Sequence, residues 1–531
     1  MSSINIILEI TSVILAVTLM FTITGQIHML QQNSYFNSRF INYLKSAFSY
    51  KTVVSIIVSA AIAALAVSKL WLYIPLLMVT AVTGIFRCIA AVSGQKNAKK
   101  KLVFTSRVKR LYAASAVILI FYLLILLILK VDLSVYVYTL AALLFLSPVY
   151  VILLNIINLP IEKLINFYYI NDAKKILKKH PDMKIIGVTG SYGKTSTKYI
   201  LGRMLSEKYN VTITPGSFNT LLGVVRTIRE HLNPATQVFV VEMGAKRVGD
   251  IKEICDLVKP QMGVITSVGE QHLSTFGSIN NVLKTKFELY DAVKSAGGTM
   301  FLNFDNELIR KNAGRGAKVV SYAAKSSNAD VYAENISASS SGSVFELNCK
   351  GERVKIQTKL LGAHNVCNIA AAAAVCMELG MSTDDIKCAA FMLESVEHRL
   401  QLRRYINGSV LIDDSYNSNP EGCIEAANVL ASFAGKRRII VTPGVIELGE
   451  REYDVNYHFG EVMAKSADDI ILVGEKRAAP MKDAIEKSGF DGERLYVVNT
   501  FKEAAAKFSS MCGSDTVILF ENDLPDNYEK Q

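Results

Sequence analysis

The stretch GVTGSYGKTSTKYIL, at residues 187–201, has the residue types of a loop that binds phosphate. Gly190 and Gly193 would let backbone N–H groups close around phosphate oxygens, and the positive end of a following helix would strengthen that contact. Lys194 would reach the β- and γ-phosphates of a nucleotide, and the hydroxyl of Thr195 would ligate Mg²⁺. The spacing therefore predicts a nucleotide-phosphate site at this turn.

The loop departs from the common phosphate-binding pattern at its start. The pattern GxxxxGK[ST] requires glycine at position 188, and this chain has Val188. Two serines of the same stretch belong to the predicted ATP-binding set, Ser191 and Ser196. The question is therefore which kind of ATP-using protein carries this form of the loop.

Alternating strands and helices would position the loop. Short runs rich in β-branched residues fit strands of a buried parallel sheet at 184–190, 237–243 and 262–268. An Ala-rich stretch at 362–380 predicts a helix that stops at Gly380. A second series of strands predicts a separate doubly wound α/β unit, at 409–415, 436–444, 468–474, 494–499 and 515–522. We expect a P-loop ATPase-like α/β central domain over 184–396 and a Rossmann-like α/β C-terminal domain over 397–531.

The N-terminal part has the composition of a transmembrane α-helical region. Five apolar runs each have about the length that a helix needs to cross a bilayer, roughly 4–24, 52–68, 71–92, 111–129 and 134–157. The first 180 residues carry 18 Lys and Arg against 4 Asp and Glu, a net charge of +14, whereas the remainder carries 40 against 43. The basic balance therefore belongs to the membrane-flanking part, which argues against a nucleic-acid partner. We expect about five transmembrane helices over 1–158.

The loops between these runs predict the orientation. Lys and Arg concentrate in 25–51 and 93–110, and positive loops stay in the cytoplasm. The chain is thus expected to be a multi-pass protein of the cell membrane with its N-terminus outside and its later domains in the cytoplasm. The cluster at 96–110 could serve orientation alone, or could contact an anionic lipid or a substrate diphosphate. The Lys-rich amphipathic segment 159–183 is expected to be a linker along the membrane surface.

Several separated motifs together point to one family. The loop TGSYGKTST is similar to the TGxxGKT[ST] loop of the Mur ligases, and the motifs that follow it keep the family order. These are VFVVEMGAKRVGDI (238–251), VITSVGEQHLSTFGS (264–278), KTKFELYD (284–291), GAHNVCNIAAAAAV (362–375), HRLQ (398–401), DDSYNSNP (413–420) and TPGVIELGE (442–450). The chain resembles the MurF-type Mur ligases, which are UDP-N-acetylmuramoyl-tripeptide–D-alanyl-D-alanine ligases. Val188 is then the position that separates this loop from the loop of general ATPases.

The resemblance implies a set of metal-binding and catalytic residues. Thr195 and Glu242 would hold Mg²⁺, and His272 matches the family's ligand for a second Mg²⁺. Lys286 matches the lysine that Mur ligases carbamylate, which turns an amine into an oxygen ligand; Lys284 is a nearby competitor for that role. The implied catalytic residues are Lys194, Lys286 and His272, with ATP and two Mg²⁺ sites as the cofactors.

The resemblance also implies contacts to ATP and to the other substrates. The matching ATP-binding residues outside the loop are Asn365, Asn368, Arg399, Asp414 and Tyr416, of which Asp414 would hold the ribose. The implied substrate residues are Asn219, Gly223, Asn417 and Asn419. An Asx-rich turn ahead of a helix is the structural alternative for the motif DDSYNSNP. Because the ATP residues come from two domains, closure of a cleft on ATP is expected before chemistry.

The resemblance implies an ATP-dependent amide ligase that works through an acyl phosphate. It would add D-Ala-D-Ala or a similar amino compound to a cell-wall precursor. Soluble MurF-type enzymes have an N-terminal domain for the UDP-sugar, and here membrane helices replace that domain, so the precursor could be UDP-linked or lipid-linked. Membrane lipids and other membrane proteins of wall synthesis are the further partners implied.

Three alternatives remain open at this point. The chain could be a polyglutamate- or pseudomurein-type ligase for another wall or capsule polymer. A P-loop transporter ATPase is a more distant alternative, although it leaves DDSYNSNP and Lys286 unexplained. A non-catalytic scaffold with a ligase fold is the last.

Overall fold

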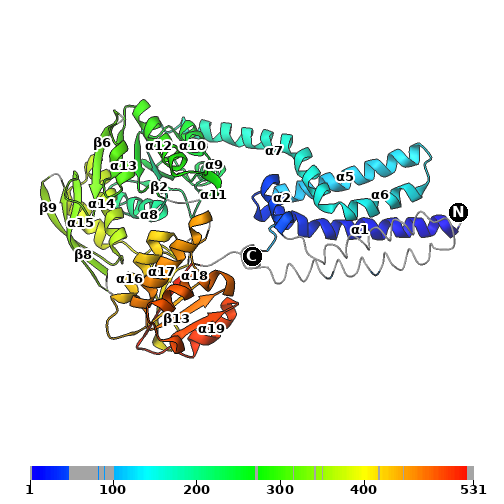
Figure 1. Cartoon of the computed structure of the whole chain (residues 1–531). Helices are drawn as coiled ribbons and strands as arrows, with labels where there is room; N and C mark the ends of the chain where they lie inside the picture. The colour runs from blue at the N-terminus through cyan, green and yellow to red at the C-terminus, as the bar shows by residue number, and fades with distance from the viewer. Residues whose placement is uncertain are drawn as a thin grey trace. The chain divides into compact units, whose positions relative to one another are not determined.

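The computed structural model describes most of the chain. The described residues are 3–46, 82, 89, 101–269, 273–314, 316–339, 342–349, 351–415, 419–446 and 448–522. The chain divides into two compact units, of which the first includes Met1–Phe167 and the second is Tyr168–Leu524 (Figure 1). Two apolar runs predicted to cross the membrane, 52–68 and 71–92, lie outside the described residues apart from positions 82 and 89.

The described part of the first unit is helical apart from short connecting turns. Its helices are α1 (Ser3–Gln32), α2 (Asn37–Ser46), α5 (Ser106–Ile128), α6 (Leu133–Phe145) and the start of α7 (Ser147–Leu177). Leu19, Ile23 and Leu140 belong to its apolar core, while Ile120 and Phe121 of α5 are about 60% exposed, at 58% and 63%. Within the described residues, three helices are long and apolar enough to cross a membrane: Leu8–Gln32, Ser106–Ile128 and Ser147–Leu177.

The single helix predicted over 134–157 is wrong. The chain breaks at Leu146 into α6, which has 13 residues, and α7. Pro148 accounts for the break, because proline has no N–H to continue a helix but fits the first turn of a new one. At about 1.5 Å per residue α6 is about 20 Å long, too short for a hydrocarbon core of about 30 Å.

Helix α7 is longer than the sequence suggested. It runs for 31 residues with Pro160 inside it, so it crosses the boundary predicted at residue 158. The amphipathic segment 159–183 is therefore mostly the second half of α7 and not a separate element. A proline inside a helix costs one backbone hydrogen bond, and the helix continues through it here.

Two arginines of the basic 93–110 segment have partners within the first unit. Arg107 Nη2 donates to Asn155 Oδ1 at 3.1 Å and its guanidinium lies 4.0 Å from the centre of the Tyr35 ring. Arg110 Nη2 lies 2.7 Å from Glu162 Oε1. These contacts join α5 to α7, so both arginines have a structural role there.

The second unit begins with a nine-stranded sheet in the order β2-β3-β1-β4-β5-β6-β7-β8-β9. Its strands are β1 (Lys184–Thr189), β2 (Val211–Ile213), β3 (Val238–Glu242), β4 (Met262–Ile265), β5 (Thr299–Asn303), β6 (Lys318–Ala323), β7 (Val331–Ser339), β8 (Gly342–Cys349) and β9 (Glu352–Thr358). The pairings from β2 to β7 are parallel, and β7, β8 and β9 pair antiparallel. The strands predicted at 184–190, 237–243 and 262–268 are thus confirmed as β1, β3 and β4.

Helices cover both faces of the parallel part of this sheet. They are α8 (Lys194–Leu205), α9 (Leu221–Glu230), α10 (Asp250–Val258), α11 (Leu273–Phe276), α12 (Ile279–Ser295), α13 (Glu307–Asn312), α14 (Ala363–Glu378) and α15 (Thr383–Phe391). Ile186 and Val188 share one core with α8 and α14, whereas Ile185 shares another with α9, α10 and α12. The Ala-rich helix predicted at 362–380 is α14, whose buried alanines 370–374 let it pack closely on the sheet.

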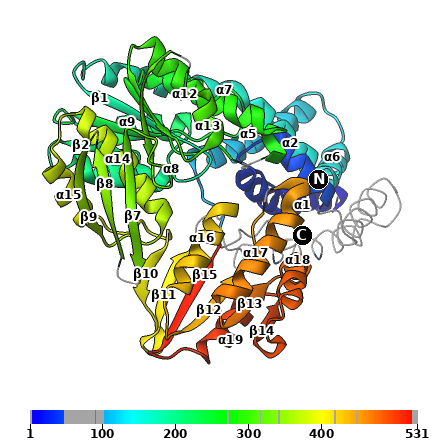
Figure 2. The ribbon, with the colours of Figure 1, turned by 60° about the vertical axis from the view of Figure 1, so that its left-hand side comes forward.

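A six-stranded sheet follows, in the order β10-β11-β15-β12-β13-β14. Its elements are β10 (Gln401–Arg404), β11 (Val410–Asp414), α16 (Pro420–Ala431), β12 (Arg437–Thr442), α17 (Glu452–Ser466), β13 (Asp469–Val473), α18 (Glu475–Lys487), β14 (Leu495–Val498), α19 (Phe501–Ser509) and β15 (Thr516–Glu521). Only β10 pairs antiparallel here. Figure 2 shows β11, β15 and β12 side by side, with α16 and α17 against one face. The predicted doubly wound α/β unit is confirmed.

Candidate active site

The predicted phosphate loop joins β1 to α8 by a turn that only glycine fits at its first position. Gly190 has a φ of +156°, and a Cβ there would lie 2.0 Å from Thr266 Oγ1 and 2.9 Å from the backbone nitrogen of Ser267. Gly193 has a φ of +77° and directly precedes α8. The loop is fixed to the end of β4, since Ser191 N donates to Ser267 O at 2.8 Å. This is a backbone cradle at a helix N-terminus, which suits a phosphate.

Lys194 is held over this loop. Its Nζ donates to Gly190 O at 2.6 Å and to Ser191 O at 2.9 Å. Burial lowers the pKa of Lys194 to about 8, the charge of Glu242 opposes that shift, and the charge of Arg399 adds to it. A lysine that rests on backbone carbonyls can exchange them for phosphate oxygens, so its position fits the role predicted for it.

Glu242 ends β3 beside the loop, because Val188 of β1 is its register partner. The carboxylate is only 1% exposed. Its Oε1 accepts from Thr195 Oγ1 at 3.1 Å and from Asn219 Nδ2 at 2.9 Å. Hard oxygen donors of this kind suit Mg²⁺. Thr195 and Glu242, predicted as metal ligands, are thus brought together, with Asn219 of the predicted substrate loop against them.

Lys198 is a residue of this cluster that we did not predict from the sequence. It lies one turn after Lys194 on α8, and its Nζ lies 3.0 Å from Glu242 Oε2. Burial pushes the pKa of Glu242 upward, but Lys198, Asn219 and Lys194 outweigh that effect and hold this pKa below its ordinary value. The sequence contains only a weak indication of this role: Lys198 follows the loop lysine by one helical turn and so faces the end of the same strand.

Lys286 is the buried lysine of α12. It is 2% exposed, whereas Lys284 is exposed. Burial, and next the charge of Lys194, hold the pKa of Lys286 well below its ordinary value, although Glu288 and Asp250 oppose the shift. Burial thus distinguishes Lys286 from Lys284, and the carbamylation of Lys286 stays a prediction.

Three predicted site residues, His272, Tyr416 and Asn417, lie outside the described residues. Among the residues that are described, no group of three or more His, Cys, Asp or Glu side chains could hold a metal ion. A metal at Thr195 and Glu242 would therefore need ligands from elsewhere, such as phosphate, water or a carbamate. The second metal site stays a prediction.

Asn365 and Asn368 lie in the first turns of α14, next to the phosphate loop. Asn368 Oδ1 accepts from Thr197 Oγ1 at 3.0 Å, and a Cβ at Gly193 would lie 3.1 Å from the same oxygen. Asn368 Nδ2 donates to Asn365 Oδ1 at 3.3 Å. The two predicted nucleotide residues are thus brought to the loop, although part of their bonding capacity is used within the protein.

Arg399 and Asp414 lie near each other at the start of the six-stranded domain. Leu400 N donates to Asp414 Oδ1 at 3.2 Å. Burial raises the pKa of Asp414, while the charge of Arg399 opposes that shift. Arg399 also helps to lower the pKa of His364 to about 4, after burial as the larger cause, and His364 Nδ1 is buried without a hydrogen-bond partner. Residues from both α/β domains therefore act electrostatically on the same region.

Two predicted substrate residues have clear structural roles. Asn419 caps α16, because its Oδ1 accepts from Gly422 N at 2.9 Å. A Cβ at Gly223 would lie 3.1 Å from the backbone of Phe218, so glycine permits a close approach at the start of α9. Both residues therefore have a packing or capping role, and their contacts to a substrate stay predictions.

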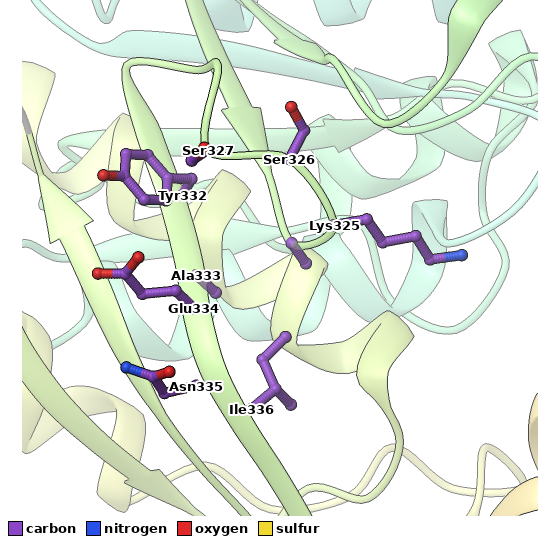
Figure 3. A pocket seen from close by; sticks show the side chains of 9 residues that line it. Lys325, Ser326, Ser327, Tyr332, Ala333, Glu334, Asn335 and Ile336 are labelled. Atoms are coloured by element: carbon purple, nitrogen blue, oxygen red, sulfur yellow. The ribbon is translucent and has the colours of Figure 1, made fainter.

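A shallow pocket of about 340 Å³ lies at the carboxyl end of β6. Residues 324–327 and 332–336 line it (Figure 3), and Lys325 and Glu334 point in different directions. Two strands, β4 and β5, separate β6 from β1, which is about 14 Å across three strand spacings. The pocket is therefore separate from the phosphate loop.

The fold and the site define a two-domain α/β protein with a phosphate-binding type of loop and a buried carboxylate beside it. Two family models match the chain, the Mur ligase middle domain over residues 188–376 and the Mur ligase glutamate ligase domain over 398–521. The chain belongs to the Mur ligase family.

Curated relatives and solved structures agree with this assignment. The UDP-N-acetylmuramoyl-tripeptide–D-alanyl-D-alanine ligase of Escherichia coli K12 is 32% identical over 300 residues, which are 56% of this chain and 66% of that protein. The ligase of the same name in Mycobacterium leprae is 30% identical over 353 residues, 61% of this chain and 67% of that protein. The alignment thus spans about two thirds of these relatives. MurF of Thermotoga maritima in complex with ADP has the same fold, with a TM-score of 0.61, 24% identity and coverage of 69% of this chain and 82% of that one.

The substitution Gly190→Ala tests the phosphate cradle. The added Cβ would clash with Thr266 Oγ1 and the backbone of Ser267. The loop must therefore move, and its N–H groups would no longer point at the bound phosphates. We expect the affinity for ADP with Mg²⁺ to fall on the order of tenfold or more, about 1.4 kcal/mol, in a calorimetric titration. Gly492→Ala is the control, because a Cβ there meets nothing within 4 Å. Equal affinities of both variants would mean that this loop does not hold the nucleotide phosphates.

Proposed function

We propose that this chain is an ATP-dependent amide ligase of the MurF type that adds D-Ala-D-Ala, or a similar amino compound, to a cell-wall precursor. The observation that carries the proposal is the convergence of Lys194, Thr195 and Glu242 at the ends of β1 and β3. Relatives that bear the name UDP-N-acetylmuramoyl-tripeptide–D-alanyl-D-alanine ligase support the substrate class. The Thermotoga maritima structure with ADP supports ATP as the nucleotide.

The reaction has two steps that this site suits. A carboxylate oxygen of the precursor attacks the γ-phosphorus of ATP, the bond from that phosphorus to the β-phosphate oxygen breaks, and ADP leaves. The nitrogen of the amine then attacks the carbonyl carbon of the acyl phosphate, inorganic phosphate leaves, and the amine loses a proton to solvent. Two anions must meet in the first step, so cationic groups lower its barrier. The backbone cradle and Lys194 would hold the phosphates, and Asn365, Asn368, Arg399 and Asp414 would orient the nucleotide.

Mg²⁺, when bound, would neutralise charge on the phosphates and orient them for attack. Thr195 and Glu242 are the described residues that would hold it. Lys286 would contribute once its neutral amine has taken up CO₂ and lost a proton, because a carbamate is an oxygen ligand. The burial of Lys286 and its lowered pKa support this part of the proposal.

Membrane attachment is the second part of the proposal. The described helices Leu8–Gln32, Ser106–Ile128 and Ser147–Leu177 support it by length and composition, and the basic loops support cytoplasmic catalytic domains. An enzyme attached to the membrane in this way would suit a precursor linked to a lipid as well as one linked to UDP. The alternative functions, ligation for a polyglutamate or a pseudomurein polymer, use a different amine. An assay of which amine drives ADP formation would distinguish them from the MurF-type function.

The substitution Lys194→Met should abolish turnover. We expect ADP formation by the native protein to require both an acyl precursor and an amine, and to fall by at least about 100-fold in the variant, because a phosphate-binding cation is lost. Lys465→Met, which alters an exposed lysine of α17, is the control. A panel of UDP- and lipid-linked precursors with different amines, read by product mass, identifies the substrates. ADP release without an amine would indicate a transport ATPase, and no release would indicate a scaffold.

Removal of CO₂ should inactivate the enzyme reversibly. Because its pKa lies well below the ordinary value, Lys286 has a larger neutral fraction at neutral pH than an ordinary lysine, and this form accepts CO₂. We expect ADP formation to fall several-fold in degassed, bicarbonate-free buffer, to return with bicarbonate, and to be lost in Lys286→Ala. Protein equilibrated with ¹³CO₂ should show a carbamate signal by NMR that Lys286→Ala lacks and Lys284→Ala keeps. A signal lost only in Lys284→Ala would assign the role to Lys284.

Fractionation tests the membrane proposal. We expect the full chain to stay with the membrane pellet after a carbonate wash and to be released by detergent, because about 20 apolar residues bury enough surface to hold a helix in lipid. Protease added to inverted vesicles should digest the catalytic domains, and protease added to intact spheroplasts should not. Digestion of the catalytic domains in spheroplasts would indicate the opposite orientation. Release of the chain by the carbonate wash would exclude membrane-spanning helices.

A further inference from the structure

Lys198 is a fully buried lysine that the reaction steps above do not use. It is 0% exposed on α8. Its Nζ donates to Gly216 O at 2.6 Å and to Glu242 Oε2 at 3.0 Å. Lysine is rarely buried completely, and its charge costs free energy there unless it is paired and hydrogen-bonded. A buried lysine with these two partners therefore has a specific task.

The two partners of Lys198 belong to different parts of the site. Glu242 is the carboxylate beside the phosphate loop, and Gly216 lies in the segment 214–220 between β2 and α9. The same segment supplies Asn219, whose Nδ2 donates to Glu242 Oε1 at 2.9 Å. Gly216 is held a second time, because its N–H donates to the hydroxyl of Tyr199 at 3.1 Å. One ammonium group thus joins α8, the end of β3 and this segment.

The contact with Lys198 also determines which oxygen of Glu242 can coordinate a cation. Its ammonium group occupies Oε2, so Oε1 is the oxygen on the side of the Thr195 hydroxyl. A rotation of the carboxylate would break the contact with Lys198 and leave a buried charge without its partner. The carboxylate is therefore fixed in the orientation in which Oε1 and Thr195 Oγ1 face each other.

We propose that Lys198 is a positioning residue that fixes the Glu242 carboxylate and the segment 214–220 together, so that binding of a divalent cation and order in this segment depend on each other. The proposal rests on the proposed function, in which Glu242 holds Mg²⁺, and on the family resemblance, which makes Asn219 of this segment a substrate residue. It extends that function by making the acyl-substrate side of the site sensitive to the metal. The groups that transmit the effect are one carboxylate, one ammonium and one peptide carbonyl.

The first measurement uses the native full chain in detergent and needs no turnover. Amide hydrogen exchange of residues 214–220 is compared for the free protein, with ADP alone, and with ADP and Mn²⁺. We expect Mn²⁺ with ADP to slow exchange in this segment several-fold beyond ADP alone. The same exchange rate with and without Mn²⁺, at concentrations that saturate the site, would overturn the proposal whether or not any variant folds.

The second measurement uses Lys198→Met, which keeps the length of the side chain but removes its charge and its donors. Loss of a partner that orients a metal ligand costs on the order of 10- to 100-fold in metal affinity, and we expect that loss for Mn²⁺ measured by paramagnetic resonance with ADP present. Affinity for ADP without metal should stay within about twofold, because the phosphate cradle is untouched. The KM of the acyl substrate should rise more than that of ATP.

Matched variants separate positioning from general destabilisation. Lys208→Met also removes a lysine that donates to a backbone carbonyl, that of Gly380, but this lysine is exposed, and it should leave every readout unchanged. Lys198→Arg keeps the charge and should recover part of the Mn²⁺ affinity. If Lys198→Met fails to fold, the double variant with Glu242→Gln should fold, because both buried charges are then gone. Native-like Mn²⁺ affinity in a folded Lys198→Met would overturn the proposal, whereas a native chain that binds no ADP would overturn the ligase function itself.

Discussion

The buried carboxylate of Glu242 is the constraint on which the rest of the site depends. An ionised carboxylate that is only 1% exposed has to be compensated by hydrogen bonds and by opposite charge. Thr195, Asn219 and Lys198 supply that compensation. Thr195 and Lys198 belong to α8 and Asn219 to the segment 214–220, so the packing of α8, of β3 and of this segment is tied to one charge. A change in any of these segments alters the field at the phosphate loop.

The parallel sheet explains how these segments meet. Carboxyl ends of neighbouring parallel strands open at the same edge of a sheet, which is where α/β proteins bind ligands. The register partner of Glu242 in β1 is Val188, and this is the position where the common loop pattern has glycine. Val188 is a fully buried core residue of a strand, so the tight turn begins later, at Gly190, where a Cβ would meet Thr266. The departure from the common pattern thus reflects a strand that extends further before its turn.

The sequence predicted the parts of the structure that depend on local pattern. Runs of β-branched residues became β1, β3 and β4, and the Ala-rich stretch became α14. It failed at two prolines: Pro148 splits the apolar run 134–157 into α6 and the start of α7, and α7 continues through Pro160. In the site, Lys194, Thr195 and Glu242 were predicted because a motif contains them. Lys198 was missed because its role depends on three segments that meet only in the fold, and the motif around Asn419 did not reveal that this residue caps α16.

The balance of charge in the site explains why a polyphosphate would fit it. The charges of Lys194 and Lys198 act on Glu242, the charge of Lys194 also acts on Lys286, and burial is the largest cause that lowers the pKa of each lysine. These lowered values mean that the folded protein holds cations at an electrostatic cost. Lys198 offsets its part through Glu242, while Lys194 rests on carbonyl dipoles. A nucleotide polyphosphate would supply negative charge beside these lysines, and a carbamate on Lys286 would add an anionic group to the same region. Burial of these lysines costs electrostatic free energy in the free protein, and an anionic ligand that offsets this cost binds more tightly. A ligase driven by ATP requires such affinity for a polyphosphate.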